Sequence, residues 1–307
     1  MAQIGKCRLI VNPVSANGAT AKKWPRIRAL LERQGLWFDH CFTERPGHAV
    51  ELARRAVEDG CQLVVAVGGD GTVNEVTNGL VGSQGEIPTG IVLGMIPTGT
   101  GADFGRTFGI PRDYEQACQH LVGETTRTID LGVIGYSNAA GPVHRYYVNV
   151  AGSGFDGEVA ERVNRSSKAL GGTIPYLSCL VVTLIAYKNK MIEIIHDGQK
   201  STRRANSLIV CNGRYFGGGM FIAPNADPSD GFLDVVVIGD TGRLEFLQAV
   251  PRVYKGTHLT HPKVESFRAR EIRIETRERM IIQADGELLG QAPATFSLIP
   301  RGLVVKV

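Results

Sequence analysis

A turn built from glycine and aspartate, Gly68–Thr72, carries the clearest chemical signal in the sequence. It reads Gly-Gly-Asp-Gly-Thr and follows a wholly apolar run that is typical of a buried strand. The residues after it predict a helix over 72–80, with Thr72 and Glu75 spaced as a capping box. Free N–H groups and the helix dipole at such a junction favour a phosphate, and glycine removes the Cβ that would keep it away. We therefore predict an anion site, with Asp70 placed to hold Mg²⁺ directly or through water. The alternative, an Asp-Gly hairpin turn, is disfavoured because the flanks do not alternate as strands would.

A second loop, Pro97–Arg106, repeats this arrangement after another apolar run. We expect Thr100 to offer its hydroxyl to a phosphate oxygen and Asp103 to join Asp70 around a metal ion. Arg106, roughly one helical turn beyond Asp103, is placed to meet a transferring phosphate. The alternative is a helix cap followed by an ordinary ion pair between residues three apart.

Three further turns carry weaker signals. Asn12–Gly18 follows the first predicted strand, but its Asn, Pro, Ser and Gly are common turn residues. Asp285–Glu287, an Asp-Gly-Glu sequence, predicts either a general base or an Asp-Gly hairpin turn. The acidic turn Asn225–Gly231 predicts either a hard-cation site or an Asx turn. The sequence contains no GxxxxGK[ST], and no GxGxxG opens its first helix, which disfavours P-loop and dinucleotide-dehydrogenase sites.

The elements that must position the first turns alternate between strand and helix. Strands are predicted at 7–11, 36–42, 62–67 and 91–96, with helices at 19–34, 46–59 and 72–80. This rhythm predicts a doubly wound α/β sheet with right-handed crossovers.

The pattern changes after about residue 130. Strand-like runs follow at 146–151, 191–195, 207–211, 233–238, 271–275 and 280–284, with about two helices, at 157–163 and 174–187. We therefore predict the α/β class, with a doubly wound α/β nucleotide-binding domain over 1–130 and a mostly antiparallel, β-sandwich-like domain over 131–307. The last run, 303–307, is a candidate to pack back on the N-terminal domain.

Composition narrows the class of protein. A formal net charge of +4 suits an anionic membrane surface or a polyphosphate ligand and is too small to predict nucleic-acid binding. Six dispersed cysteines without a CxxC pair predict reduced core thiols in a cytoplasmic protein. The N-terminus lacks the apolar core of a signal peptide, and the most apolar helix candidate, 176–187, is too short to span a bilayer. We expect a cytoplasmic protein with no transmembrane segment.

Taken in order, these turns resemble the diacylglycerol kinase catalytic-domain family, especially the bacterial soluble lipid kinases of the diacylglycerol kinase B and YegS type. The similarity extends through nearly the whole chain. Its motifs are Asn12-Pro13 with Gly18, Gly68–Glu75, Gly99–Arg106, Asn212–Tyr215 with Gly217–Gly219, Ala223–Asp234 and Asp285–Glu287. The resemblance implies an ATP- and Mg²⁺-dependent kinase that transfers the γ-phosphoryl group to a hydroxyl of diacylglycerol or a related lipid. It also implies peripheral association with the membrane surface, and the family includes homodimers.

The resemblance further implies roles for individual residues. The ATP site would be lined by Asn12, Pro13, Thr43, Gly68, Gly69, Asp70, Gly71, Thr72, Val73, Asn74, Glu75, Gly99 and Thr100. A catalytic magnesium network would lie near Asp70 and Asp103, in a cleft between the domains, with Arg106 supplying further positive charge. A structural Mg²⁺ would be held by Asp227, Asp230 and the backbone carbonyl of Phe232. Either Asp285 or Glu287 would be the general base. The family often has Asn before the acid of the second loop, where this chain has Ala102, which puts one polar contact to the metal-water network in doubt.

Two other functions remain open at the level of sequence. Gly-Gly-Asp-Gly also resembles NAD kinases and phosphofructokinases, so the acceptor could be a soluble molecule; the Asn-Pro turn and the late Asp-Gly-Glu favour a lipid kinase. A non-catalytic nucleotide-binding module gains slight support from Ala102, whereas the acidic residues Asp70, Asp103, Asp285 and Glu287 argue against it.

Overall fold

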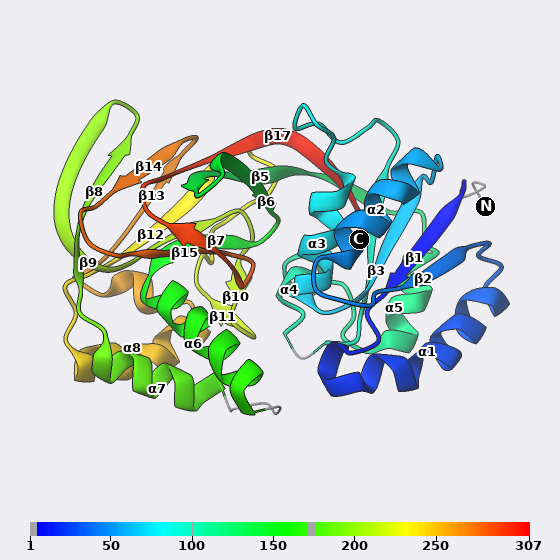
Figure 1. Ribbon diagram of the computed structural model, residues 1–307, viewed down its shortest axis with the longest axis horizontal. Coiled ribbons are helices and arrows are strands. Elements are labelled where there is room, and N and C mark those ends of the chain that lie inside the picture. Colours follow the sequence, from blue (N-terminus) through cyan, green and yellow to red (C-terminus); the bar gives the residue numbers. More distant parts are fainter. Residues whose placement is uncertain (1–4, 100, 171–175) are drawn as a thin grey trace. The chain divides into compact units, whose positions relative to one another are not determined.

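The computed structural model describes residues 5–99, 101–170 and 176–307 (Figure 1). The chain forms two compact units. The first comprises residues up to Leu131 together with Gly217–Gly219 and Ile299–Val307, and the second comprises Gly132–Phe216 and Met220–Leu298. Two strands, β5 (Thr126–Asn138) and β17 (Ala294–Lys306), contribute residues to both units.

The first unit is built on a parallel sheet. Its strands lie in the order β2 (Asp39–Phe42), β1 (Cys7–Val11), β3 (Leu63–Gly68), β4 (Val92–Pro97) and the end of β17. Every residue of β3 is buried, as expected of a strand covered on both faces. Val304 and Val305 of β17 pair with β4, so the last residues of the chain complete this sheet.

Helices connect these strands. They are α1 (Ser15–Arg33), α2 (His48–Glu58), α3 (Asp70–Leu80), α4 (Asp103–Phe108) and α5 (Tyr114–Leu121). Regular helix geometry in α1 begins only after Gly18, because residues 16–18 have left-handed backbone angles. The capping box predicted at Thr72 is wrong. Helix α3 begins two residues earlier, its N-cap is Gly69, and the Glu75 carboxylate accepts N–H bonds from Gly47 and Ala49 at the start of α2.

Helices α2 and α3 pack closely at Gly79. A Cβ added there would lie against the carbonyl oxygen of Val50 and 2.6 Å from the Cβ of Ala53. We expect Gly79→Ala to destabilise the chain by about 1–3 kcal/mol because the helices must separate. Urea-unfolding midpoints test this. Gly71→Ala is the matched control, since a Cβ there meets nothing within 4 Å and alanine is favoured over glycine in a helix. Equal midpoints for the two variants would contradict the prediction.

The second unit is mainly antiparallel. One run of its sheet has the order β16 (Glu287–Gln291), β15 (Ile281–Ala284), β7 (Val150–Gly154), β9 (Gln199–Cys211), β8 (Lys190–His196), β14 (Ile272–Glu275) and β17. Strand β9 also pairs with β12 (Leu233–Gly239), which pairs with β13 (Val264–Ala269), and β5 pairs with β6 (Gly141–Tyr147). A small hairpin joins β10 (Tyr215–Phe216) and β11 (Met220–Phe221). The single strand predicted at 146–151 is wrong, because Val148 and Asn149 separate β6 from β7.

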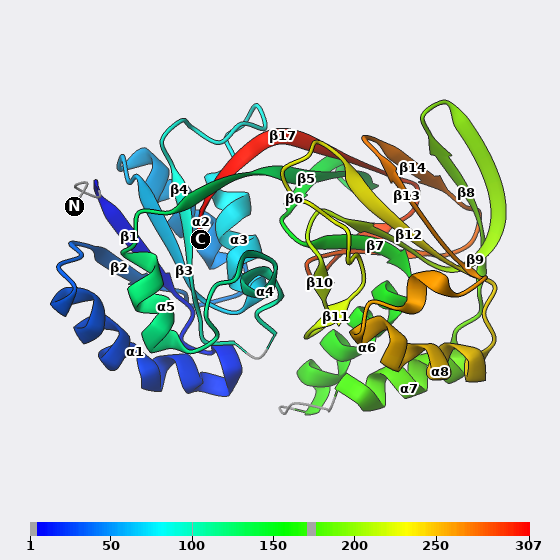
Figure 2. The same ribbon diagram turned by 180° about the vertical axis from the view of Figure 1, so that it is seen from behind.

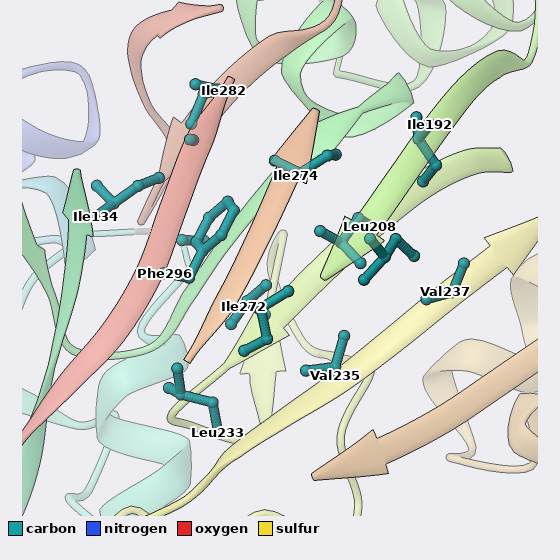
Figure 3. Close-up of a cluster of buried hydrophobic side chains, with 14 of the residues drawn as sticks. Ile134, Ile192, Leu208, Leu233, Val235, Val237, Ile272, Ile274, Ile282 and Phe296 are labelled. Atoms are coloured by element: carbon teal, nitrogen blue, oxygen red, sulfur yellow. The ribbon is translucent and has the colours of Figure 1, made fainter. Parts of the chain in front are cut away.

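The main core of this unit lies among its strands. Branched aliphatic side chains from β8, β9, β12 and β14 meet Phe296 of β17 and Ile282 of β15 (Figure 3). The predicted class, an α/β nucleotide-type domain followed by an antiparallel β-sandwich-like domain, is confirmed by this arrangement.

Among the residues that the structure describes, three helices accompany this unit rather than the two predicted. They are α6 (Phe155–Leu170), α7 (Tyr176–Ala186) and α8 (Arg243–Tyr254), and a 3₁₀ turn follows at His258–Thr260 (Figure 2). Helix α8 escaped prediction because none of its residues is buried and Pro251 lies within it, so its apolar periodicity is weak. No helix in the described part of the chain is both long and apolar enough to cross a membrane.

Asp156, at the start of α6, is a carboxyl group with a strongly shifted titration. Burial raises its pKa to about 6, although Gln283 Nε2 donates a hydrogen bond to its Oδ2 at 2.9 Å. Since the unfolded chain releases this proton near pH 4, the group's contribution to stability is lost as pH rises from about 4 to about 6, by roughly 3 kcal/mol.

We therefore expect Asp156→Asn to show a smaller loss of stability between pH 4 and pH 7 than the parent chain. Urea-unfolding midpoints measured across that range for both proteins test this. Identical pH profiles would show that Asp156 is not the group responsible.

Candidate functional site

The carboxyl ends of β1, β3 and β4 bring the three predicted turns of the first unit together. The Asn12 N–H donates to the carbonyl of Val67 at 2.9 Å, and the N–H groups of Thr98 and Gly99 donate to the carbonyl of Gly68 at 2.9 and 3.2 Å. The turns after the first, third and fourth strands thus lie side by side at one edge of the sheet.

Glycine is required where the two main loops touch. A Cβ on Gly99 would lie 2.6 Å from the Cα of Gly69, and a Cβ on Gly101 would lie 2.6 Å from Asp70 Oδ2. A Cβ on Gly68 would collide with the Thr72 side chain. The glycines therefore permit the backbone of one loop to rest on the other.

The Asp70 carboxylate binds the second loop directly. Its Oδ2 accepts from the N–H of Asp103 and its Oδ1 from the N–H of Phe104, both at 3.1 Å. These are donors at the start of α4, where the N-cap residue is Ala102, which has no capping side chain. Ala102 also has a left-handed backbone with φ of 55°, a conformation that asparagine tolerates better than alanine. Asp70 thus supplies from another loop the cap that Ala102 cannot supply.

Asp103 lies beneath this loop, only 4% exposed. Its Oδ2 accepts the N–H of Gly218 at 2.7 Å, and its Oδ1 lies 3.5 Å from Arg106 Nε. Burial raises the pKa of the Asp103 carboxyl, and the negative charge of Asp70 raises it further, against the opposing effects of the Gly218 N–H and Arg106. A cation beside Asp70 and the buried Asp103 would stabilise the charged form of both carboxylates.

The other residues predicted to line the ATP site differ in their burial and hydrogen bonds. Asn12 Nδ2 donates to Thr72 Oγ1 at 3.1 Å, and the Thr43 N–H donates to the carbonyl of Val11. Val73 and Asn74 are buried, and Pro13 accepts a backbone bond from Ala21. Thr100 lies outside the described residues.

Two buried acceptors in this unit suit a further ligand. Asn12 Oδ1 and Asp103 Oδ1 are buried and accept no hydrogen bond within the described residues. Glycine turns, helix amino ends and unsatisfied oxygens fit a metal–polyphosphate ligand. The described residues contain no group of three or more His, Cys, Asp or Glu side chains arranged around a metal position, so most of the metal's ligands here would be phosphate oxygens and water.

Gly217–Gly219, part of the motif set that resembles the family, lie next to the second loop of the site. Gly218 donates to Asp103, and a Cβ on Gly219 would lie 3.2 Å from the guanidinium carbon of Arg106. All three residues have positive φ. The run of glycines was the available signal, but nothing in the sequence indicated its partner.

In the second unit, Asp285 occupies a two-residue turn between β15 and β16. Asp285 and Gly286 have φ of 47° and 86°, so the backbone is the Asp-Gly hairpin that was the alternative prediction. The Asp285 side chain nevertheless has a defined position, because it accepts N–H bonds from Val148, Asn149 and Val150 at 2.9–3.0 Å. Glu287 forms an ion pair with Arg145 at 2.7 Å.

The acidic turn that follows Ala226 forms Asx-type bonds. Asp227 Oδ1 accepts from the Ser229 N–H and hydroxyl, and Asp230 Oδ1 accepts from the N–H of Phe232. Asp230 also pairs with Arg268. Beside them Asp234 Oδ2 is buried without a hydrogen-bond partner among the described residues, and its pKa is raised to about 6 by burial and by the charges of Asp230 and Asp227, against Arg268. These bonds are those of the Asx turn that was the alternative prediction, and in the described residues the three carboxylates are not arranged around a common metal position.

Comparisons with known proteins identify the family. Residues 6–134 match the diacylglycerol kinase catalytic domain, and residues 149–307 match the YegS C-terminal NAD kinase beta sandwich-like domain. A diacylglycerol kinase of Mycobacterium tuberculosis is 32% identical over 305 residues, covering 99% of this chain and 95% of that protein. The diacylglycerol kinase of Bacillus subtilis is 28% identical over 301 residues, with 98% and 95% covered.

Solved structures agree. A crystal structure of a Bacillus anthracis protein assigned as a diacylglycerol kinase superposes with a TM-score of 0.80 at 26% identity, covering 100% of this chain and 98% of that one. Yeast NADH kinase, at 10% identity and a TM-score of 0.51 over 99% of this chain and 84% of that one, shares the fold alone. These matches support a kinase, and the chain belongs to the diacylglycerol kinase family.

Proposed function

We propose that this protein is an ATP- and Mg²⁺-dependent lipid kinase that transfers the γ-phosphoryl group to a hydroxyl of diacylglycerol or a related lipid. The observation that carries the proposal is the pair of glycine loops held together by the Asp70 carboxylate in a chain of this family. These loops present backbone N–H groups and carboxylates at the carboxyl ends of parallel strands, where α/β sheets bind nucleotides.

The chemistry assigned to the site follows from charge. Phosphoryl transfer passes through a loose, anionic transition state, so catalysis depends on positioning and on neutralising charge. Mg²⁺ bound to the triphosphate would supply positive charge, with Asp70 and Asp103 as its carboxylates. The loop N–H groups and Arg106 act on the phosphate oxygens. The proton of the lipid hydroxyl passes to Asp285 or Glu287.

The proposal assigns the turn around Asp227 and Asp230, with the carbonyl of Phe232, to a structural Mg²⁺. A ligand that binds only the folded chain raises its stability, by about 2.7 kcal/mol at a hundred times its Kd. We therefore expect millimolar Mg²⁺ to raise the Tm by a few degrees, and Asp227→Asn to remove most of that increase. Differential scanning fluorimetry with Mg²⁺ or EDTA tests this. Asp197→Asn, at an exposed hairpin of the same unit, is the control. An unchanged increase in Asp227→Asn would refute the assignment.

The activity itself is tested with radiolabelled ATP. The full chain is incubated with Mg²⁺ and detergent-dispersed diacylglycerol, ceramide, sphingoid base or phosphatidylglycerol, and in parallel with NAD⁺, with mass-spectrometric identification of products. Phosphorylation of a lipid supports the proposal. Phosphorylation of NAD⁺ alone would overturn it in favour of a soluble acceptor, and tight ATP binding without transfer would favour a regulatory module.

A further inference from the structure

The outer faces of α7 and α8 expose large apolar side chains. On α7, Val181, Val182 and Ile185 are 40%, 47% and 60% exposed; on α8, Leu244 and Leu247 are 76% and 42% exposed. The inner sides of these helices pack together with α6 through an apolar cluster, and both figures show α7 and α8 along the same edge of this unit (Figures 1 and 2). The two helices thus pack side by side, and we call their exposed apolar residues the α7–α8 face.

Cationic side chains border this face. Helix α7 has no charged residue of its own, but Lys188 follows it and Arg243 begins α8. Both are exposed, and neither has an ion-pair or hydrogen-bond partner within the described residues. Arg204 lies beside them and donates to the carbonyl of Asn189 at 3.2 Å.

These cations line a shared pocket of about 290 Å³, together with Tyr187 and Asn189. The one carboxylate in the lining, Asp240, accepts a hydrogen bond from Asn189 Nδ2 at 2.8 Å. Three cations against one carboxylate leave the pocket positive. A phosphate group matches it in charge, and guanidinium and ammonium groups are the usual protein donors to phosphate.

We propose that the α7–α8 face docks on an anionic phospholipid bilayer, with a lipid headgroup phosphate in the Lys188–Arg204–Arg243 pocket and the apolar side chains in the interfacial layer. Helices that lie in the plane of a membrane surface combine exposed apolar side chains with neighbouring basic side chains. The inference deepens the proposed function, because a lipid acceptor in a membrane would be reached from this surface. Docking itself does not depend on kinase activity, but its role in catalysis rests on the proposed function.

Sedimentation with vesicles tests the docking. The full chain is expected to bind phosphatidylglycerol–phosphatidylcholine vesicles at low salt and to bind pure phosphatidylcholine much less. Each cation near an anionic surface contributes about fivefold to binding, so Lys188→Gln with Arg243→Gln should weaken it about 25-fold. Val182→Asn with Ile185→Asn should weaken vesicle binding by about tenfold or more. At high salt this variant should also bind less than the parent chain does.

Matched variants in the first unit control for net charge and surface polarity. Lys22→Gln with Arg54→Gln removes the same charge from exposed positions, and Trp37→Asn removes an apolar side chain that is 91% exposed. Both should bind vesicles as the parent does. The proposal is overturned if these controls weaken binding as much as the face variants do, or if folded face variants bind normally. It is also overturned if inorganic phosphate binds at Lys188 and Arg243 while vesicles are not recruited, which would mark a site for free anions.

A separate assay keeps this inference distinct from the proposed function. A monomeric short-chain diacylglycerol needs no bilayer, so the face variants should phosphorylate it at the parent rate. If the parent chain binds vesicles but phosphorylates no lipid, the proposed function fails and the docking stands. If it phosphorylates the short-chain lipid but ignores vesicles, the docking fails and the function stands.

Discussion

Asp70→Asn is expected to reduce lipid phosphorylation roughly a hundredfold or more, and to lower stability by about 1 kcal/mol because its amide nitrogen opposes one of the two N–H donors. Asparagine is nearly isosteric, and its one carbonyl oxygen can still accept one of the N–H bonds from Asp103 and Phe104. It has lost the negative charge that the proposal assigns to the magnesium network. Turnover measured against Mg²⁺ concentration should show a lower maximum and a higher Mg²⁺ requirement.

Two comparisons separate this chemical role from capping. Asp70→Ala removes both N–H acceptors and should also destabilise α4, by about 1 kcal/mol, the usual contribution of a cap. Asp113 caps α5 by accepting N–H bonds from Glu115 and Gln116, so Asp113→Asn is a capping control away from the proposed site and should retain turnover. If Asp70→Asn phosphorylates lipid at the parent rate at saturating Mg²⁺, Asp70 serves only to hold the loops together.

Asp285→Asn has the second large expected effect, a loss of about a hundred- to ten-thousandfold in turnover if Asp285 is the general base. Three backbone N–H groups converge on its two oxygens, and an amide nitrogen would oppose one of those donors. We therefore also expect a stability loss of about 1–3 kcal/mol from the unsatisfied N–H. A lost base is recognised by the pH profile of kcat/KM, which should lose its acidic limb, whereas a purely structural defect would keep the limb.

Glu287→Gln and Asp197→Asn complete the test. Asp197 and Gly198 form a similar Asp-Gly turn between β8 and β9, with φ of 48° and 74°, so Asp197→Asn changes the same residue type in the same type of turn, at an exposed position. An active Asp285→Asn beside an inactive Glu287→Gln would transfer the role to Glu287. If Asp285→Asn and Glu287→Gln both phosphorylate lipid at the parent rate, neither residue is the general base.

The sequence predicted those parts of the site that depend on local order. An apolar strand followed by glycines specifies a turn at the end of β3, and parallel pairing places the ends of β1 and β4 beside it. Partners distant in the chain could not be predicted. Asp70 binds amides 33 and 34 residues later, and Asp285 binds amides more than 130 residues earlier. Such contacts depend on the packing of whole elements, which no local pattern encodes.

The same reasoning explains the errors in the fold. The capping box at Thr72 had the right spacing, but Glu75 finds better donors at the start of α2, which is distant in sequence. Helix α8 buries none of its residues, so the periodicity that reveals other helices is missing. Phe246 and Val253 are only partly buried, whereas Leu244 and Leu247 are exposed and belong to the candidate docking surface.

Completion of the first sheet by β17 has a consequence for biosynthesis. Residues Ile299–Val307 belong to the first unit, yet a ribosome makes them only after the second unit. While the rest of the chain is being synthesised, the open edge of β4 has no neighbour at Val92 and Leu93, and an unpaired edge strand promotes aggregation. A gene fragment ending near residue 131 should therefore yield insoluble protein, and removal of the last few residues should damage the amino-terminal half of the molecule most.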